Sequence, residues 1–137
     1  MRITLLHLFS FLGNVLKEIV EPMGAVIFSN RFTLGDPTIN TLELWGAEYQ
    51  ENDAVLVRDL KILKEIAKRE RCPLDHVGVV LDNGRIILSE ESENDFDAYL
   101  NGTNDKNKRH PVDLDLELVL GKMPRKVNVI LFKFSKT

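Results

Sequence analysis

The chain has 137 residues, of which 44% are hydrophobic and 28% charged, and its formal net charge is −3. This is the balance of one ordinary globular domain, which can bury a core without a disulfide or a metal ion. Its single cysteine, Cys72, excludes an internal disulfide and a multi-cysteine zinc site, and it fits a reducing, cytoplasmic location. The negative charge disfavours nucleic acid and anionic membranes as partners, so we expect a small molecule or a protein.

The N-terminal segment, residues 1–12, is apolar after its first two residues and resembles the start of a secretory signal. It contains His7 and Ser10, no small-residue cleavage site follows it, and it is much shorter than the roughly 20 residues that span a bilayer. We therefore expect no membrane-spanning segment, and we treat residues 1–12 as a divergent N-terminal extension. A small secreted protein remains the alternative if this segment is a signal.

The first predicted elements are a helix and a strand. Apolar residues recur at helical spacing over residues 14–21, and Pro22 stops that helix. Residues 24–28 form an apolar run typical of a buried strand. Asp36 and Pro37 then favour the start of a second helix, because aspartate caps unpaired amides and proline suits the first helical position.

In the second predicted helix, we expect Leu42 and Trp45 to face the core and Gly46 to end the helix. Residues 54–57 read as a strand. Asp59 then predicts the cap of a third helix. Its inward residues are expected to be Leu60, Leu63, Ile66 and Ala67.

The third helix ends in basic residues, which the negative end of a helix dipole favours. Beyond it, residues 76–81 and 85–88 are two β-branched runs joined through Asn83-Gly84. Because Asn-Gly tolerates positive φ angles, this pattern predicts a β-hairpin.

Residues 89–110 are acidic and then rich in Asn, Lys and Gly, so we expect a flexible polar loop there. Residues 112–116 alternate like a strand, and residues 117–120 suggest a helical turn. The final apolar run, residues 127–134, lies in a C-terminal tail and is consistent with an edge strand or with no native element. Together these elements predict an α+β sandwich with mostly antiparallel pairing and helices on one face.

Motifs of common catalytic sites are missing from the sequence. It contains no glycine-rich phosphate loop, no pair of histidines at metal spacing and no Gly-x-Ser-x-Gly elbow. The histidines His7, His76 and His110 are far apart and more typical of structural than of catalytic positions. Cys72 follows the C-terminus of a helix, where a thiolate is disfavoured, so we interpret it as inert.

One polar cluster surrounds Trp45 between the second helix and the following strand. It consists of Glu43, Glu48, Gln50 and Glu51. A solvated connection explains these residues without any function. The alternative is that a carboxylate and an amide at alternate positions point the same way and bind the hydroxyls or amides of a polar ligand.

These residues also carry a family resemblance. The stretch GAVIFSNRFTLGDPTINTLELWGAEYQENDAVLV (residues 24–57) resembles the large, single-chain form of phosphoribosylformylglycinamidine synthase, as do RERCP (69–73) and PVDLDLELVLGKMPRK (111–126) in the same order. The resemblance runs from residue 13 to about 126. It implies the second subdomain of the first synthetase half, an incomplete α/β sandwich like the C-terminal domain of aminoimidazole ribonucleotide synthetase.

The resemblance implies an ATP- and glutamine-dependent ligase of purine biosynthesis, which converts formylglycinamide ribonucleotide to its amidine. ATP phosphorylates the amide oxygen, and ammonia from glutamine then displaces phosphate. The family's Glu-x-Gln motif, which contacts the ribonucleotide, falls on Glu48 and Gln50. Tyr49, where the small bacterial form has serine, stays unassigned.

Other parts of the family machinery have no counterpart here. The family carries a glycine-rich turn with a magnesium-binding aspartate just before the position of Gly13, where this chain has apolar residues. The resemblance thus implies ATP and magnesium, with no binding residue identified, and remaining synthetase and glutaminase domains outside the chain. We expect the isolated chain to be an inactive fragment that self-associates through an uncovered apolar face. A non-catalytic, ferredoxin-like binding or regulatory domain remains the alternative.

Overall fold

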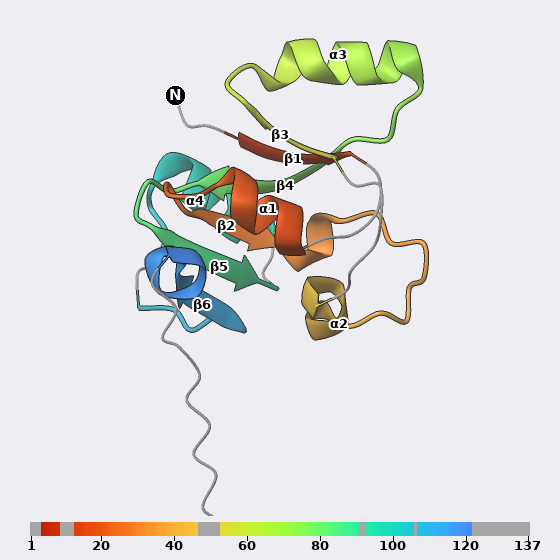
Figure 1. The fold of residues 1–137 in the computed structure, drawn as a ribbon. Helices are drawn as coiled ribbons and strands as arrows, with labels where there is room; N and C mark the ends of the chain where they lie inside the picture. Colours follow the sequence, from red (N-terminus) through yellow and green to blue (C-terminus); the bar gives the residue numbers. More distant parts are fainter. Residues whose placement is uncertain (1–3, 9–12, 47–52, 91–92, 106, 122–137) are drawn as a thin grey trace, which may run out of the picture.

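The computed structural model describes residues 4–8, 13–46, 53–90, 93–105 and 107–121. In these ranges the strands are β1 (Thr4–Leu8), β2 (Ala25–Phe28), β3 (Asp53–Val57), β4 (Asp75–Val80), β5 (Arg85–Ser89) and β6 (Val112–Asp115). The α-helices are α1 (Gly13–Ile19), α2 (Thr41–Gly46), α3 (Leu60–Glu70) and α4 (Glu93–Asn101). A 3-10 turn, η1 (Ser29–Arg31), and a π-helical turn, η2 (Glu117–Gly121), complete the set (Figure 1).

The strands form one mixed sheet in the order β3-β1-β4-β2-β5-β6. β1 is antiparallel to β3 and β4, β2 is antiparallel to β4, and β5 is antiparallel to β6. The pairing of β2 with β5 is parallel. The α+β class with mostly antiparallel pairing is confirmed, and part of the apolar N-terminal segment forms β1, which pairs on both sides.

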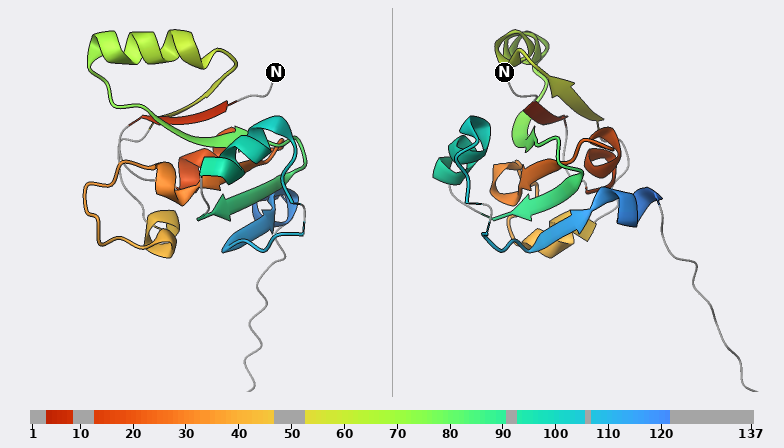
Figure 2. Two further views of the ribbon diagram at one scale, coloured as in Figure 1. Left: turned by 180° about the vertical axis from the view of Figure 1, so that it is seen from behind. Right: turned by 90° about the vertical axis from the view of Figure 1, so that its left-hand side faces the viewer.

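Helices cover both faces of the sheet, so the expectation of helices on one face is wrong. On β2, Ala25 and Ile27 pack in the cluster that includes α1, whereas Val26 and Phe28 pack in the cluster that includes α4. Figure 2 shows α1 and α4 on opposite sides when the sheet is viewed nearly edge-on. Four consecutive buried apolar residues in β2 are the pattern of a strand covered on both faces.

The connection between β4 and β5 is not the predicted hairpin, because β2 lies between these strands. The turn instead wraps over the start of β2. The amide of Leu81 donates to the carbonyl of Gly24 (3.0 Å), and the amides of Asn83 and Gly84 donate to the carbonyl of Met23 (2.8 and 3.0 Å). The Asn-Gly signal identified the reversal of the chain, but a local signal does not determine which strand is inserted between its arms.

Asp36 does not open the second helix. Its Oδ1 accepts hydrogen bonds from the amide and hydroxyl of Thr38 (2.9 and 2.7 Å), which close a turn before α2 begins. The later start rotates the helix face, so Leu44 is buried, Trp45 is half-buried and Leu42 is exposed. The expected inward position of Leu42 is therefore wrong.

α3 begins as predicted, after Asp59. The Asp59 Oδ1 accepts hydrogen bonds from the amides of Lys61 and Ile62 (3.0 and 3.3 Å), which satisfies two amides of the first turn. Ala67 is buried as expected, but Ile66 is exposed, so its inward position is wrong. α3 stands above one end of the sheet in Figure 1, and only a narrow stripe of it faces the protein.

Residues 89–110 contain α4 where the composition indicated a loop. The rings of Phe96 and Tyr99 are buried against Phe28, with centroid distances of 5.0 and 5.8 Å. Two aromatic residues three positions apart lie on one helical face and give this acidic segment an apolar anchor that average composition does not reveal. The expectation of no regular structure is wrong over α4, and the flexibility of the rest of the segment stays a prediction.

The remaining predicted elements fall where the sequence placed them. α1, β2, β3, β4, β5, β6 and η2 correspond, within a few residues at each end, to the predicted helices and strands. Residues 127–134, the final apolar run, lie outside the described residues.

Candidate functional site

The predicted substrate contacts, Glu48 and Gln50, lie in residues 47–52, outside the described residues, and so does Glu51 of the same polar cluster. The structure does describe both flanks of this connection, which runs from the end of α2 to the start of β3. These flanks determine where the connection sits in the fold.

The α2 flank is fixed by a reciprocal cap. The Oδ1 of Asn40 accepts hydrogen bonds from the amides of Leu42 and Glu43 (3.0 Å each), and the Oε2 of Glu43 accepts one from the amide of Asn40 (2.9 Å). This arrangement is a capping box, which satisfies amides at the start of a helix. Glu43, a member of the polar cluster, therefore has a structural role, which its spacing from Asn40 could have indicated.

Trp45, in the last turn of α2, is held against the body of the protein. It packs on the core cluster that α1 and β2 share, and the Lys17 ammonium lies 4.8 Å from the centre of its ring. Burial lowers the pKa of Lys17, an effect that the nearby Glu18 carboxylate opposes. The connection that carries Glu48 and Gln50 thus leaves from an anchored helix end.

The β3 flank lies at one end of the sheet, where several segments meet. In the strand register, Leu8 at the end of β1 pairs with Asp53 at the start of β3, and His7 pairs with Asp75 at the start of β4. The segment between β1 and α1, residues 9–12, therefore leaves the sheet beside the connection 47–52. Thr33 adds the loop before α2, because its amide and hydroxyl donate to the Asp75 carboxylate (2.7 and 2.9 Å).

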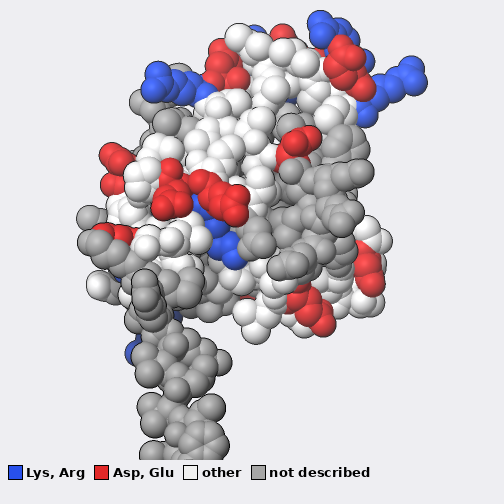
Figure 3. Space-filling view, in the orientation of Figure 1, with Lys and Arg blue, Asp and Glu red and all other residues white. Residues whose placement is uncertain are grey.

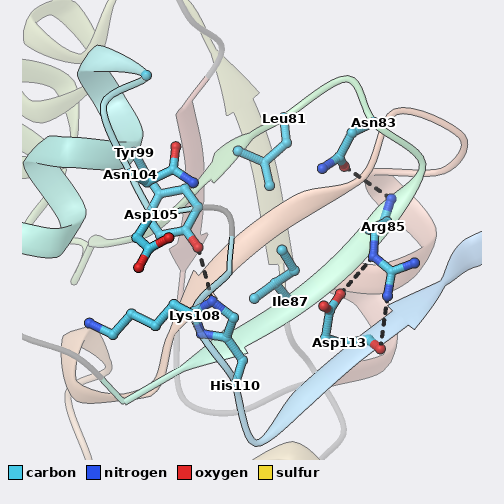
Figure 4. Close-up of a pocket in the computed structure, with 11 residues that line it drawn as sticks. Leu81, Asn83, Arg85, Ile87, Tyr99, Asn104, Asp105, Lys108, His110 and Asp113 are labelled. Carbon is cyan, nitrogen blue, oxygen red and sulfur yellow. Dashed lines mark hydrogen bonds and ion pairs between the residues drawn. The ribbon is translucent and has the colours of Figure 1, made fainter.

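A separate cleft of about 440 Å³ lies between the end of α4, the following loop and strands β5 and β6 (Figure 4). Its floor is formed by Leu81 and Ile87. On one side Arg85 pairs with Asp113 (Nε to Oδ1, 2.8 Å), an interaction that raises the pKa of Arg85. None of the predicted site residues lines this cleft, and its charges of both signs do not select one class of ligand.

The histidines occupy unrelated positions. His110 shares a hydrogen bond with the Tyr99 hydroxyl (Nε2 to Oη, 3.0 Å) beside the cleft. His76 on β4 lies edge-on to the Phe96 ring with centroids 4.6 Å apart. Burial, followed by the positive charges of Arg31 and Lys64, lowers the pKa of His76 to about 4. This imidazole is therefore neutral near pH 7.

Within the described ranges, no group of three or more His, Cys, Asp or Glu side chains is arranged to hold a metal ion. The helices of these ranges also include none with the length and apolar character needed to cross a membrane. Cys72 is a half-buried free thiol whose Sγ lies 3.5 Å from the carbonyl of Pro73.

The fold is similar to that of solved bacterial structures. One titled "T. maritima PurL complexed with ADP" aligns with a TM-score of 0.62 and 15% identity, over 99% of this chain and 27% of that chain. Another, titled "T. maritima PurL complexed with FGAR", aligns with a TM-score of 0.58 and 20% identity, over 96% of this chain and 20% of that chain. At these identities the likeness shows the fold alone.

The sequence relationships are stronger. The chain is 53% identical over 119 residues to phosphoribosylformylglycinamidine synthase of Drosophila melanogaster and 50% identical over 119 residues to that of Homo sapiens. Each match covers 83% of this chain but only 9% of the relative's length. No family model matches the sequence. The identities over most of the chain nevertheless show that it belongs to the phosphoribosylformylglycinamidine synthase family.

Proposed function

We propose that this chain is a substrate-binding segment of a phosphoribosylformylglycinamidine synthase, with Glu48 and Gln50 as contacts to formylglycinamide ribonucleotide. The observation that carries the proposal is the 53% identity to a named family member, in a chain that contains the family's Glu-x-Gln motif. The solved neighbour whose title names FGAR is consistent with this substrate. A single cysteine, Cys72, is consistent with a cytoplasmic enzyme.

The geometry of the flanks supports a ligand site at this end of the sheet. The connection 47–52 starts at the anchored end of α2 and enters β3 at Asp53, whose partner is Leu8. Residues 9–12 follow Leu8 directly, and the family's glycine-rich turn would fall just before Gly13. Two segments that the family uses for substrate and metal would therefore lie side by side.

The chemistry assigned to this segment is binding and orientation. An ionised Glu48 accepts hydrogen bonds and suits the hydroxyls of a ribonucleotide, whereas Gln50 can both donate and accept. We infer that ATP and magnesium act with other parts of the enzyme, because the described residues do not fit a magnesium site. Since the chain spans 9% of its relatives' length, we expect no amidine synthesis from the isolated chain with ATP, glutamine and formylglycinamide ribonucleotide.

The test uses a complete family enzyme that carries this segment. Glu48→Ala should lower kcat/KM for the ribonucleotide about ten- to a hundredfold or more, since losing a charged hydrogen-bond partner costs about 1.5–3 kcal/mol. Gln50→Ala should cost less. Glu51→Ala, in the same connection but outside the motif, is the matched control, and glutaminase activity assayed separately should stay intact. Unchanged kcat/KM in both motif variants would make the connection structural only.

A further inference from the structure

Exposed apolar side chains are concentrated on two surfaces of the described structure. Apart from Leu42 on α2, the exposed large hydrophobic residues lie on α3 or on β6 and η2. The first surface, called the α3 surface below, contains Ile62 (56% exposed) and Ile66 (41% exposed), one helical turn apart. The second, the η2 surface, contains Leu114, Leu118 (60% exposed) and Leu120.

The two surfaces carry opposite charge. α3 has four basic residues and two acidic ones, and its lysines line a shallow groove along the helix. Figure 3 shows basic side chains projecting at this end of the molecule. Between residues 112 and 121 the charged residues are all acidic and all exposed, namely Asp113, Asp115 and Glu117.

A single copy cannot bring these surfaces together. α3 connects β3 to β4 and stands above the β3 end of the sheet, whereas β6 is the opposite edge strand. Figures 1 and 2 place α3 and η2 at opposite ends of the molecule in each view. A contact between them therefore requires two molecules arranged head to tail.

We propose that the α3 surface of one copy docks on the η2 surface of a second copy, with Ile62 and Ile66 against the exposed leucines and the lysines against the acidic residues. This inference does not depend on the substrate site. Opposite charges favour the encounter and orient it, while burial of the isoleucines and leucines holds it. An 11-residue helix is only about 16 Å long, so the interface belongs to the small, transient class below about 1,200 Å².

The full chain at micromolar to millimolar concentration should show reversible, concentration-dependent association in sedimentation velocity. Because the charges are exposed, association should weaken as sodium chloride rises from 50 to 500 mM, which we give as rough limits on the screening of surface charge. An α3 variant (Ile62→Glu with Lys64→Glu) and an η2 variant (Glu117→Lys with Leu118→Lys) should each raise the dissociation constant at least about tenfold. Leu42→Gln, at a 63% exposed leucine outside both surfaces, should not.

Mixing the two variants distinguishes this arrangement from general stickiness. The α3 variant keeps an intact η2 surface, and the η2 variant keeps an intact α3 surface, so the mixture should form a 1:1 dimer that stops there. Circular dichroism of each variant checks that the fold is retained. A monomeric wild-type chain at millimolar concentration, association unaffected by either variant, or a mixture that stays monomeric while both variants are folded would each overturn the proposal. The second of these outcomes would point to a different self-association surface.

Discussion

Thr33 donates two hydrogen bonds to the Asp75 carboxylate, one from its amide (2.7 Å) and one from its hydroxyl (2.9 Å), across 42 positions of sequence. This pair ties the loop before α2 to the start of β4, at the sheet end beside the connection 47–52. It is a long-range contact between two polar residues, and no local pattern in the sequence indicates it. Both residues lie near the surface, so the pair acts mainly by holding the loop in place.

Asp75→Ala should lower the free energy of unfolding by about 1 kcal/mol, because two hydrogen bonds to a solvent-accessible carboxylate are lost. Asp75→Asn keeps one acceptor oxygen and should cost less. Urea unfolding of both variants, with the exposed Asp97→Ala as control, gives the comparison. Equal stability of Asp75→Ala and wild type would mean that the pair contributes nothing to folding.

Local signals predicted most elements of this fold but not their arrangement. The Asp59 cap and the apolar runs of β2 and β4 depend on neighbouring residues, and they were predicted correctly. The insertion of β2 between β4 and β5 depends on contacts that are distant in sequence, and it was missed. The substrate motif, Glu48 and Gln50, came from family resemblance, since a carboxylate and an amide in a polar connection have no distinctive spacing.

The α4 segment shows a different limit of sequence reasoning. Its composition is polar, but Phe96 is almost fully buried in contact with Phe28. Phe96→Ala should therefore lower the free energy of unfolding by about 3–5 kcal/mol, the usual cost of removing a buried phenylalanine ring. Thermal and urea unfolding measure the loss, and Tyr99→Phe, which keeps the ring but removes the hydroxyl bonded to His110, should cost clearly less. A loss below about 1 kcal/mol would restore the interpretation of this segment as a loosely held loop.

The stability of the protein should also depend on His76 at mildly acidic pH. Its pKa is lowered to about 4 in the folded protein, whereas a histidine in an unfolded chain has a pKa near 6.5. Between these values the unfolded state binds the additional proton, so stability falls as pH decreases from about 6.5 toward 4. Because the side chain is partly exposed, we expect solvent to limit the effect to about 1 kcal/mol.

His76→Gln removes this titration. The difference in unfolding free energy between wild type and His76→Gln should change between pH 7 and pH 5, and the carboxylates that titrate in both proteins largely cancel in it. Arg31 and Lys64, whose charges contribute to the shift, remain in both proteins. A difference that is constant across this range would show that His76 titrates normally in the folded protein.

Gly24 is the position where the fold leaves least room for a side chain. It has a φ of +80°, and a Cβ added there would lie 2.5 Å from both the backbone nitrogen and the backbone oxygen of Arg85. These are backbone atoms of β5, which pairs in parallel with β2 beginning at the next residue, so relief of the clash would require the two strands to separate. The carbonyl of Gly24 also accepts the hydrogen bond from Leu81 that holds the turn between β4 and β5. Gly24→Ala should therefore combine the strain of a positive φ with a loss of strand pairing and lower the free energy of unfolding by about 2–4 kcal/mol. Gly35→Ala is the matched control, because nothing lies within 4 Å of a Cβ at that position, and it should change stability by less than about 1 kcal/mol in either direction. Urea unfolding and amide exchange of β2 and β5 would measure both effects. Similar stability for the two variants would mean that β2 and β5 do not approach as closely at Gly24 as the structure places them.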